Sequence, residues 1–177
     1  HQTNLNLGVS ANPAVFGQTL IISANLVDGV SPTGNITFRD GANVLGTAPI
    51  SGLSASIATD ALEPGTHVLT AEYAGDALNT PDTSQVINLV VNRAATTTTV
   101  PPIPAIRFGQ SANVVATLGV TAPGNGTPTG TITVTGGSDT CTITLPATTC
   151  VLTPATFSAN VEVTASYAGD ARFQASS

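Results

Sequence analysis

Apolar and polar residues alternate along several stretches of this chain. The longest stretch covers residues 18–27, and strict alternation over such a length predicts a half-buried β-strand. Residues 35–39, 66–73 and 84–92 alternate in the same way. Each stretch therefore has one face for a core, formed by Leu20, Ile22, Ala24 and Leu26, then Ile36 and Phe38, then His67, Leu69, Ala71 and Tyr73, and finally Ile87, Leu89 and Val91.

Turn signals separate these stretches and predict how they connect. Asp40-Gly41 is a hairpin signal, because the central positions of a tight hairpin turn favour residues that tolerate a positive φ. Glu63-Pro64-Gly65 predicts a corner later in the chain. With further strands at residues 3–12, 43–48 and 53–59, the first half has seven predicted strands, which is typical of an immunoglobulin-like Greek-key sandwich.

The second half of the chain repeats the first. The sequence Tyr-Ala-Gly-Asp stands at residues 73–76 and returns at residues 167–170, and the segments before it are also similar. An internal repeat of this size indicates tandem domains. We therefore expect an all-β protein made of two tandem immunoglobulin-like Greek-key β-sandwiches, residues 1–93 and residues 94–177.

The repeat is incomplete at its end. After Asp76 the first half continues through the predicted strand at residues 84–92, whereas only residues 171–177 follow Asp170. The sequence therefore predicts that the second sandwich lacks its last strand, which would leave an apolar slot between two strand edges. Because the chain contains no methionine, residue 1 is not a translation start, and we expect a processed or excised part of a longer protein.

Charged residues are sparse and mostly acidic. Four Arg and no Lys stand against 10 Asp and Glu, which gives a formal net charge of −6. Nucleic acids and anionic membrane surfaces bind clusters of Lys and Arg, so we expect neither as a partner. No apolar run approaches the ~20 residues of a membrane-spanning helix, so we expect no membrane span.

Several motifs together resemble a known family. They are Phe16-Gly17-Gln18, Pro32-Thr33-Gly34 and its copy at residues 128–130, Leu45-Gly46-Thr47, Pro64-Gly65-Thr66-His67 and the two copies of Tyr-Ala-Gly-Asp. In this order they resemble the bacterial Ig-like repeat domains that occur in tandem in large secreted and cell-surface proteins. The resemblance covers both halves and implies a stalk, a spacer or an adhesive array with no catalytic residues to carry over. It also implies neighbouring Ig-like domains, of the same or another chain, as partners.

The second half departs from the family pattern at residues 136–139 and 158–160, and it carries Cys141 and Cys150. In a hairpin that turns at Leu145-Pro146, midway between them, the two cysteines would face each other within disulfide distance. A metal site would need more ligands than two thiols, and a redox pair would have a C-x-x-C spacing. We therefore expect a structural disulfide, and with it an oxidising compartment and a secreted, extracellular or cell-surface protein.

A few other residues are candidates for a site. Asp76 and Asp170 could be calcium ligands, but the chain has no D-x-D-x-D-G loop, and an Asp in a Gly-Asp turn commonly accepts hydrogen bonds from the local backbone. We interpret both as structural turn residues, with calcium as the alternative, and expect no other cofactor. A catalytic role for His67 would need a nucleophile and an orienting acid, and the sequence identifies neither. We therefore expect a packed, hydrogen-bonded histidine. Tyr73 and Tyr167 could be ligand-stacking aromatics, but an aromatic content of 4% provides no exposed aromatic platform, so we expect them to pack in the core or at a corner.

Three functions are open at this point. The first is a non-catalytic structural repeat of an extracellular or cell-surface bacterial protein, which acts as a stalk, spacer or surface-array module. The second is a subunit of an extracellular filament, in which the incomplete second domain accepts a β-strand from a neighbour and assembles head to tail. The third is an adhesin or carbohydrate-binding module that uses loops such as residues 122–127. An enzyme is not expected, because the sequence contains no metal triad, paired-acid constellation or nucleophile elbow.

Overall fold

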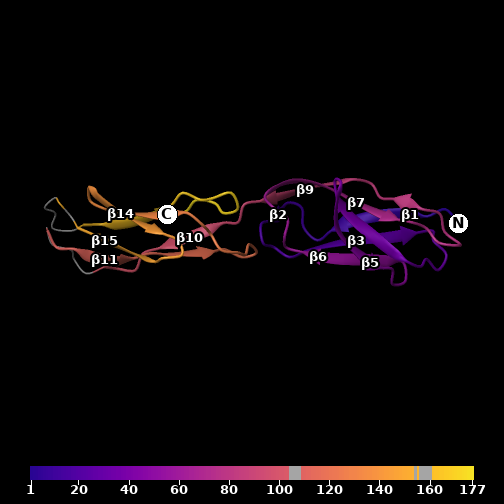
Figure 1. Cartoon of the computed structure of the whole chain (residues 1–177), viewed down its shortest axis with the longest axis horizontal. Helices are drawn as coiled ribbons and strands as arrows, with labels where there is room; N and C mark the ends of the chain where they lie inside the picture. Colours follow the sequence, from indigo (N-terminus) through magenta and orange to yellow (C-terminus); the bar gives the residue numbers. More distant parts are fainter. Residues whose placement is uncertain (104–108, 154, 156–160) are drawn as a thin grey trace. The chain divides into compact units, whose positions relative to one another are not determined.

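The computed structural model describes residues 1–103, 109–153, 155 and 161–177 (Figure 1). The chain divides into two compact units, unit 1 (His1–Asn92) and unit 2 (Arg93–Ser177). The described residues form β-strands, turns and irregular segments, so the expected all-β class is confirmed. They include no helix with the length and hydropathy that crossing a membrane requires. The departure from the family pattern at residues 158–160 lies outside the described residues.

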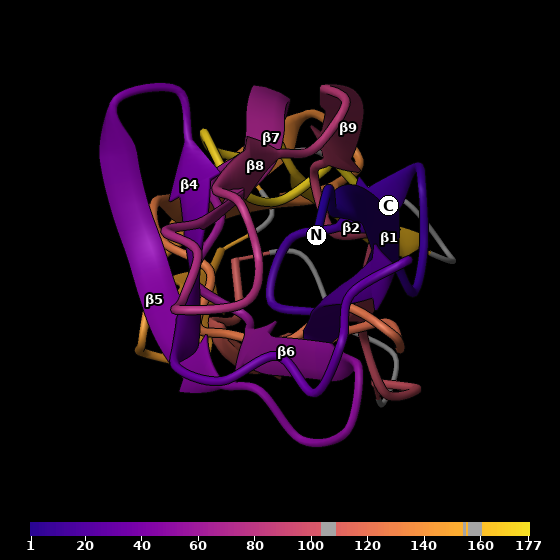
Figure 2. The ribbon, with the colours of Figure 1, turned by 90° about the vertical axis from the view of Figure 1, so that its right-hand side faces the viewer.

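Unit 1 contains two sheets. The first has the strand order β1-β3-β6, with β1 (Asn4–Val9), β3 (Leu20–Val27) and β6 (Ser54–Thr59). The second has the order β2-β9-β7-β4-β5, and β8 pairs with the end of β7. Its strands are β2 (Ala14–Val15), β4 (Asn35–Asp40), β5 (Asn43–Pro49), β7 (Gly65–Tyr73), β8 (Asp82–Thr83) and β9 (Ile87–Asn92). Figure 2 shows β5, β4, β7 and β9 in succession along one side of the unit, with β6 on the opposite side.

The predicted alternation accounts for the core between these sheets. The inward residues predicted on β3 and β4 are at most 2% exposed, and Leu69, Ala71 and Leu89 are fully buried. The first strand is shorter than predicted, because the chain leaves the first sheet after Val9 and joins the second sheet as β2. Pro13 lies at this change of sheet, where its missing N–H costs no ladder hydrogen bond.

The predicted hairpin after β4 is confirmed, with its centre one residue later than expected. Asp40 pairs with Asn43 in the ladder between β4 and β5, so the two central residues are Gly41 and Ala42. Gly41 has a φ of +54°, a conformation that glycine adopts without steric cost.

Unit 2 repeats this arrangement in its described residues. Its sheets have the orders β10-β12, β11-β15 and β14-β13-β16. The pair β10-β12 corresponds to β1-β3, the pair β11-β15 corresponds to β3-β6, and the order β14-β13-β16 corresponds to β5-β4-β7. The first two pairs form separate sheets because the counterpart of β3 is divided into β11 and β12 at Ala116. The strands are β10 (Thr96–Thr99), β11 (Ala112–Val115), β12 (Thr117–Val120), β13 (Thr131–Gly136), β14 (Asp139–Thr144), β15 (Thr149–Leu152) and β16 (Val163–Tyr167).

Candidate functional site

The two repeated motifs, Tyr-Ala-Gly-Asp and Pro-Thr-Gly, contact each other within unit 1. Oδ2 of Asp76 accepts hydrogen bonds from the backbone N–H of Thr33 at 2.8 Å and from its hydroxyl at 3.1 Å. Oδ1 accepts from the backbone N–H groups of Leu78 and Asn79 and from the Asn79 side-chain amide, at 2.8, 2.9 and 2.8 Å. The Asp76 carboxylate therefore joins the loop after β7 to the loop before β4.

Unit 2 contains the same contact. Oδ2 of Asp170 accepts from the backbone N–H of Thr129 at 2.9 Å and from its hydroxyl at 2.8 Å. Oδ1 accepts from the backbone N–H groups of Arg172 and Phe173, both at 2.8 Å. The Tyr167 hydroxyl donates to the Thr129 carbonyl at 2.8 Å. Sequence reasoning noticed both motifs but missed their contact, although their joint return in the second half was the signal for it.

These hydrogen bonds control the charge of the two aspartates. The Leu78 N–H and several further donors lower the pKa of Asp76 well below its ordinary range. Burial acts to raise the pKa of Asp170, but the Thr129 donors and the backbone N–H groups that follow outweigh it, so that pKa also lies well below its ordinary range. Burial and the nearby Asp170 charge raise the pKa of Tyr167 to about 12. At neutral pH both aspartates are ionised hydrogen-bond acceptors, and Tyr167 is a neutral donor.

The hydrogen-bond donors around Asp76 and Asp170 argue against the alternative that these residues bind calcium. A carboxylate offers about four lone-pair positions, and a calcium ion requires six or more oxygen ligands. A cation at either aspartate would have to displace donors that already occupy these positions. Across the part of the chain that the structure describes, no group of three or more His, Cys, Asp or Glu side chains could hold a metal ion. The geometry therefore favours the structural interpretation of both residues.

The glycine of each Tyr-Ala-Gly-Asp motif is required by the turn itself. Gly75 has a φ of +82°, and a Cβ atom there would lie 2.8 Å from the Asn79 carbonyl oxygen. Gly169 has a φ of +84°, and its Cβ would lie 2.9 Å from the Phe173 carbonyl oxygen. Tyr73 and Tyr167, at the start of the two motifs, are buried, which agrees with their predicted packing in the core or at a corner. Gly and Asp of the motif thus have the same structural role in both turns.

His67 makes two short polar contacts at the opposite end of β7. Its Nδ1 lies 2.6 Å from Oδ2 of Asp40, and its Nε2 lies 2.8 Å from the Glu63 carbonyl oxygen. Both partners accept, so both ring nitrogens donate when His67 is protonated and Asp40 is ionised. Burial acts to lower the pKa of His67, but the Asp40 carboxylate and the Glu63 carbonyl outweigh it and raise the pKa above 6.5. The predicted packed, hydrogen-bonded histidine is confirmed.

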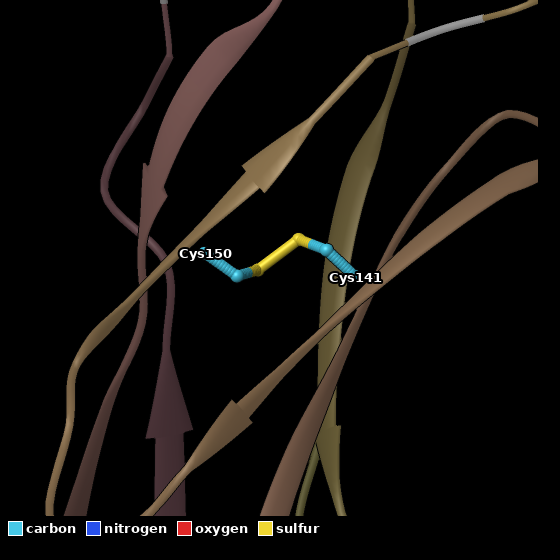
Figure 3. The surroundings of a disulfide bond; sticks show 2 residues. All are labelled: Cys141 and Cys150. Atoms are coloured by element: carbon cyan, nitrogen blue, oxygen red, sulfur yellow. A yellow bond between two sulfur atoms is a disulfide. The ribbon is translucent and has the colours of Figure 1, made fainter.

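The predicted disulfide between Cys141 and Cys150 is present, with a Cα–Cα distance of 5.9 Å (Figure 3). Its predicted setting in a hairpin is wrong. Cys141 lies on β14, which pairs with β13, whereas Cys150 lies on β15, which pairs with β11. The chain changes sheets between the two cysteines, so the disulfide connects two sheets rather than the two strands of one hairpin.

The two positions of unit 1 that correspond to the disulfide are occupied by Gly46 and Ile57. The ladder partners of Cys141 and Cys150 correspond to those of Gly46 and Ile57 in unit 1. A Cβ atom on Gly46 would lie 3.5 Å from the Ile57 side chain, so the two positions are in contact across the sheets. Unit 2 therefore has a covalent bond where unit 1 has a packing contact.

Unit 2 also has a groove between β10 and β16. Its volume is about 320 Å³, and it is lined by Thr98, Val100, Val163, Thr164, Ala165 and Ser177. The corresponding place in unit 1 is filled by the segment that continues from β8 into β9, where Leu89 is fully buried.

A family model and a set of solved modules are similar to this chain. No curated protein matches the chain. Among solved structures, the fibronectin(III)-like modules of Clostridium thermocellum CbhA are similar, with 15% identity, a TM-score of 0.40, and coverage of 98% of this chain and 89% of that chain. The family model for the bacterial Ig-like domain (group 3) matches residues 7–92. The family match identifies no catalytic domain. Residues 7–92, which make up most of unit 1, are thus similar to the bacterial Ig-like domains of group 3.

Proposed function

We propose that this chain is a non-catalytic structural part of an extracellular bacterial protein, in which two domains divided near residue 93 act as a tension-bearing spacer. Ig-like domains of this kind are typical of extracellular modular proteins, and residues 7–92 match the model of this family. The Cys141–Cys150 disulfide is consistent with an oxidising compartment. The observation that supports the spacer role is the parallel pairing of β9, the last strand of unit 1, with β2.

In unit 1 the last strand pairs in parallel with a strand near the beginning of the chain. Ala14 of β2 pairs with Val91 of β9, and Val15 pairs with Asn92. The Phe16 N–H also donates to the Asn92 carbonyl at 2.8 Å. Tension on the two ends of the unit pulls parallel neighbours in opposite directions along their length. The hydrogen bonds between them are then loaded together, rather than broken one after another as in an antiparallel hairpin pulled open from its end.

Asn12 extends this connection from the loop before β2. Its side-chain amide nitrogen donates to the Asn88 carbonyl at 2.9 Å, and its side-chain oxygen accepts from the Val90 N–H at 3.1 Å. Both partners lie on β9. The side chain therefore adds two cross-connections that resist the same sliding motion.

The test is single-molecule force spectroscopy on the full chain, pulled from its ends. The two units are told apart because the disulfide withholds residues 141–150 from the extension of unit 2. Asn12→Ala removes two hydrogen bonds of about 1 kcal/mol each, so we expect a lower unfolding force for unit 1 and an unchanged force for unit 2. Asn43→Ala, at an exposed position on β5, is the matched control and leaves both forces unchanged. Equal unit 1 forces in the two variants would contradict the proposed load path.

We also propose that unit 2 is one strand short within residues 93–177. Tyr167 is bridged to Ser176 much as Tyr73 is paired with Asp82, so the described residues of unit 2 extend only to the counterpart of β8. A filament would follow if another molecule supplied a strand at this edge. The family match is silent on filament assembly and on adhesion, so the spacer is the function that the observations favour.

A further inference from the structure

We propose that Asn125 is a self-modification site, at which the chain loses a side-chain amide through a cyclic imide formed with Gly126. The product is aspartate or isoaspartate, and water is the only co-reactant. The inference does not depend on the spacer function. Three features of the described residues carry it: the contact between Asn125 and Gly126, their place in an exposed loop, and the protection of the other asparagines by the fold.

The reaction needs only an asparagine and the peptide nitrogen that follows it. The Gly126 nitrogen attacks Cγ of Asn125, so that a new C–N bond closes a five-membered ring and the bond from Cγ to Nδ2 breaks. The Gly126 N–H gives its proton to solvent, the departing nitrogen takes one up, and ammonia leaves. Water then opens the ring at either of its two carbonyl carbons, and no atom changes its oxidation state. Because the reacting groups belong to neighbouring residues, the ring closes without an enzyme.

The structure places the two reacting groups side by side. Oδ1 of Asn125 accepts a hydrogen bond from the Gly126 N–H at 2.8 Å. This contact holds the side-chain carbonyl group, which contains Cγ, beside the attacking nitrogen. Gly126 has no Cβ atom to hinder the approach, and its φ of +126° belongs to a conformation that other residues rarely adopt. Both residues are exposed, so water reaches the ring.

The backbone at Asn125 is not held in a strand. Ring closure rotates the Cα–C bond of the asparagine, and a strand fixes that dihedral, ψ, at about +115 to +135°. Asn125 lies between β12 and β13, outside every ladder. Within the described ranges, neither Asn125 nor Gly126 takes part in a backbone–backbone hydrogen bond. The ring therefore forms without the loss of a ladder hydrogen bond.

The other described asparagines lack these conditions. Asn12 precedes Pro13, whose nitrogen has no proton to give up. Asn79 is 4% exposed, and its side-chain amide donates to the Val30 carbonyl and to Asp76. The rest lie within strands and precede residues other than glycine: Asn4, Asn6, Asn25, Asn35, Asn43, Asn88, Asn92 and Asn113. The fold thus confines the reaction to Asn125.

The modification changes the loop and leaves the sheets intact. Either product adds a negative charge to a chain whose formal net charge is −6. Isoaspartate also adds a methylene group to the backbone, in the segment between β12 and the contact of Thr129 with Asp170. Because the modified residue lies outside the ladders, we expect unit 2 to stay folded.

The experiment incubates the full chain in mildly alkaline buffer and maps every asparagine by proteolytic digestion and mass spectrometry. We expect the amide of Asn125 to be lost at least about tenfold faster than that of any other described asparagine, since only its reacting groups are positioned for ring closure. Chromatography is expected to separate aspartate and isoaspartate forms of the peptide that contains residue 125. Direct hydrolysis of the amide by water would give aspartate alone. A digest made before incubation corrects for changes during digestion.

Two variants test the role of Gly126. Gly126→Ala places a Cβ atom on the residue whose nitrogen attacks, and we expect the reaction to slow at least about tenfold. Gly124→Ala makes the same change on the other side of Asn125, in the same loop, and is expected to keep the natural rate. Asn125→Gln would need a larger ring and is expected to retain its amide.

Three results would each overturn the site. They are a loss of amide at residue 125 no faster than at the other described asparagines, aspartate as the only product, and equal rates in Gly126→Ala and Gly124→Ala. The rate and the pair of products are measured on the unaltered chain, so they decide the question even if a variant disturbs the loop.

Discussion

His67 and Asp40 form an ionic hydrogen bond in a chain that carries few charged groups. The Nδ1–Oδ2 distance is 2.6 Å, and the two side chains are 13% and 23% exposed. The pair joins the turn after β4 to the corner at Glu63, which precedes β7. A proton held by His67 therefore supports a long-range contact of unit 1.

The first prediction follows from the raised pKa of His67. A histidine whose pKa is higher in the folded protein than in the unfolded chain stabilises the fold below pH 6.5, and this contribution is lost as the pH rises through the folded pKa. We expect the melting temperature of unit 1 to fall as the pH is raised above 6.5, and His67→Gln to remove this fall. His1→Gln, at the exposed first residue, is the matched control and preserves it. Parallel pH profiles of the natural chain and His67→Gln, measured by calorimetry, would refute the assignment.

Sequence reasoning at this scale succeeded where a residue's environment follows from its neighbours. The alternation around β3 and β4 identified Ile22, Phe38 and other core residues, because successive side chains of a strand point to opposite faces. It did not identify the contacts of Asp76 with Thr33 or of His67 with Asp40. These contacts join loops and strand ends that are distant in the sequence, and no local pattern records their proximity.

At the scale of elements, the disulfide is a connection between sheets. Cys141 on β14 and Cys150 on β15 occupy positions at which unit 1 has Gly46 and Ile57. A disulfide between sheets limits their separation even when the hydrogen bonds within each sheet are intact. In unit 2 the disulfide holds the two sheets together although apolar side chains beside β16 are only partly buried.

The second prediction concerns this connection. The bridge closes a short loop, and replacing both Cys141 and Cys150 by Ala is expected to destabilise unit 2 by roughly 2–3 kcal/mol in the chain-entropy description. Urea unfolding followed by tryptic cleavage and mass spectrometry reports each unit separately. Unit 1 contains no cysteine and serves as the internal control, so its midpoint is expected to stay unchanged. An equal shift of both midpoints would show that the variant acts through something other than the loss of the bridge.

At the scale of the whole molecule, the described residues beside β7 and beside β16 differ between the two units. Unit 1 has β9 beside β7, whereas the corresponding edge of β16 borders a groove of about 320 Å³. A sandwich with uncovered apolar residues loses part of the free energy that its core would otherwise contribute. The two units of one chain are therefore expected to differ in stability.

The third prediction is that heating unfolds the chain in two calorimetric transitions, with unit 2 unfolding first. The transitions are assigned with two variants that act on different units. His67→Gln is expected to move only the higher transition at acidic pH, and the double Cys variant only the lower one. A single transition that moves with both variants would contradict independent units.

The sequence by itself determined the class of the molecule and the places where its chain turns. Alternation, glycine turns and the repeat of Tyr-Ala-Gly-Asp are local or internal patterns, and they led to strands, two compact β units and the Cys141–Cys150 pair. Only the tertiary structure decided which strands lie together. It placed β14 and β15 in different sheets, paired β2 in parallel with β9, and set the groove beside β16. The reason is physical: an alternating strand buries its apolar face equally well beside several partners, and the choice among them depends on the packing of the whole unit.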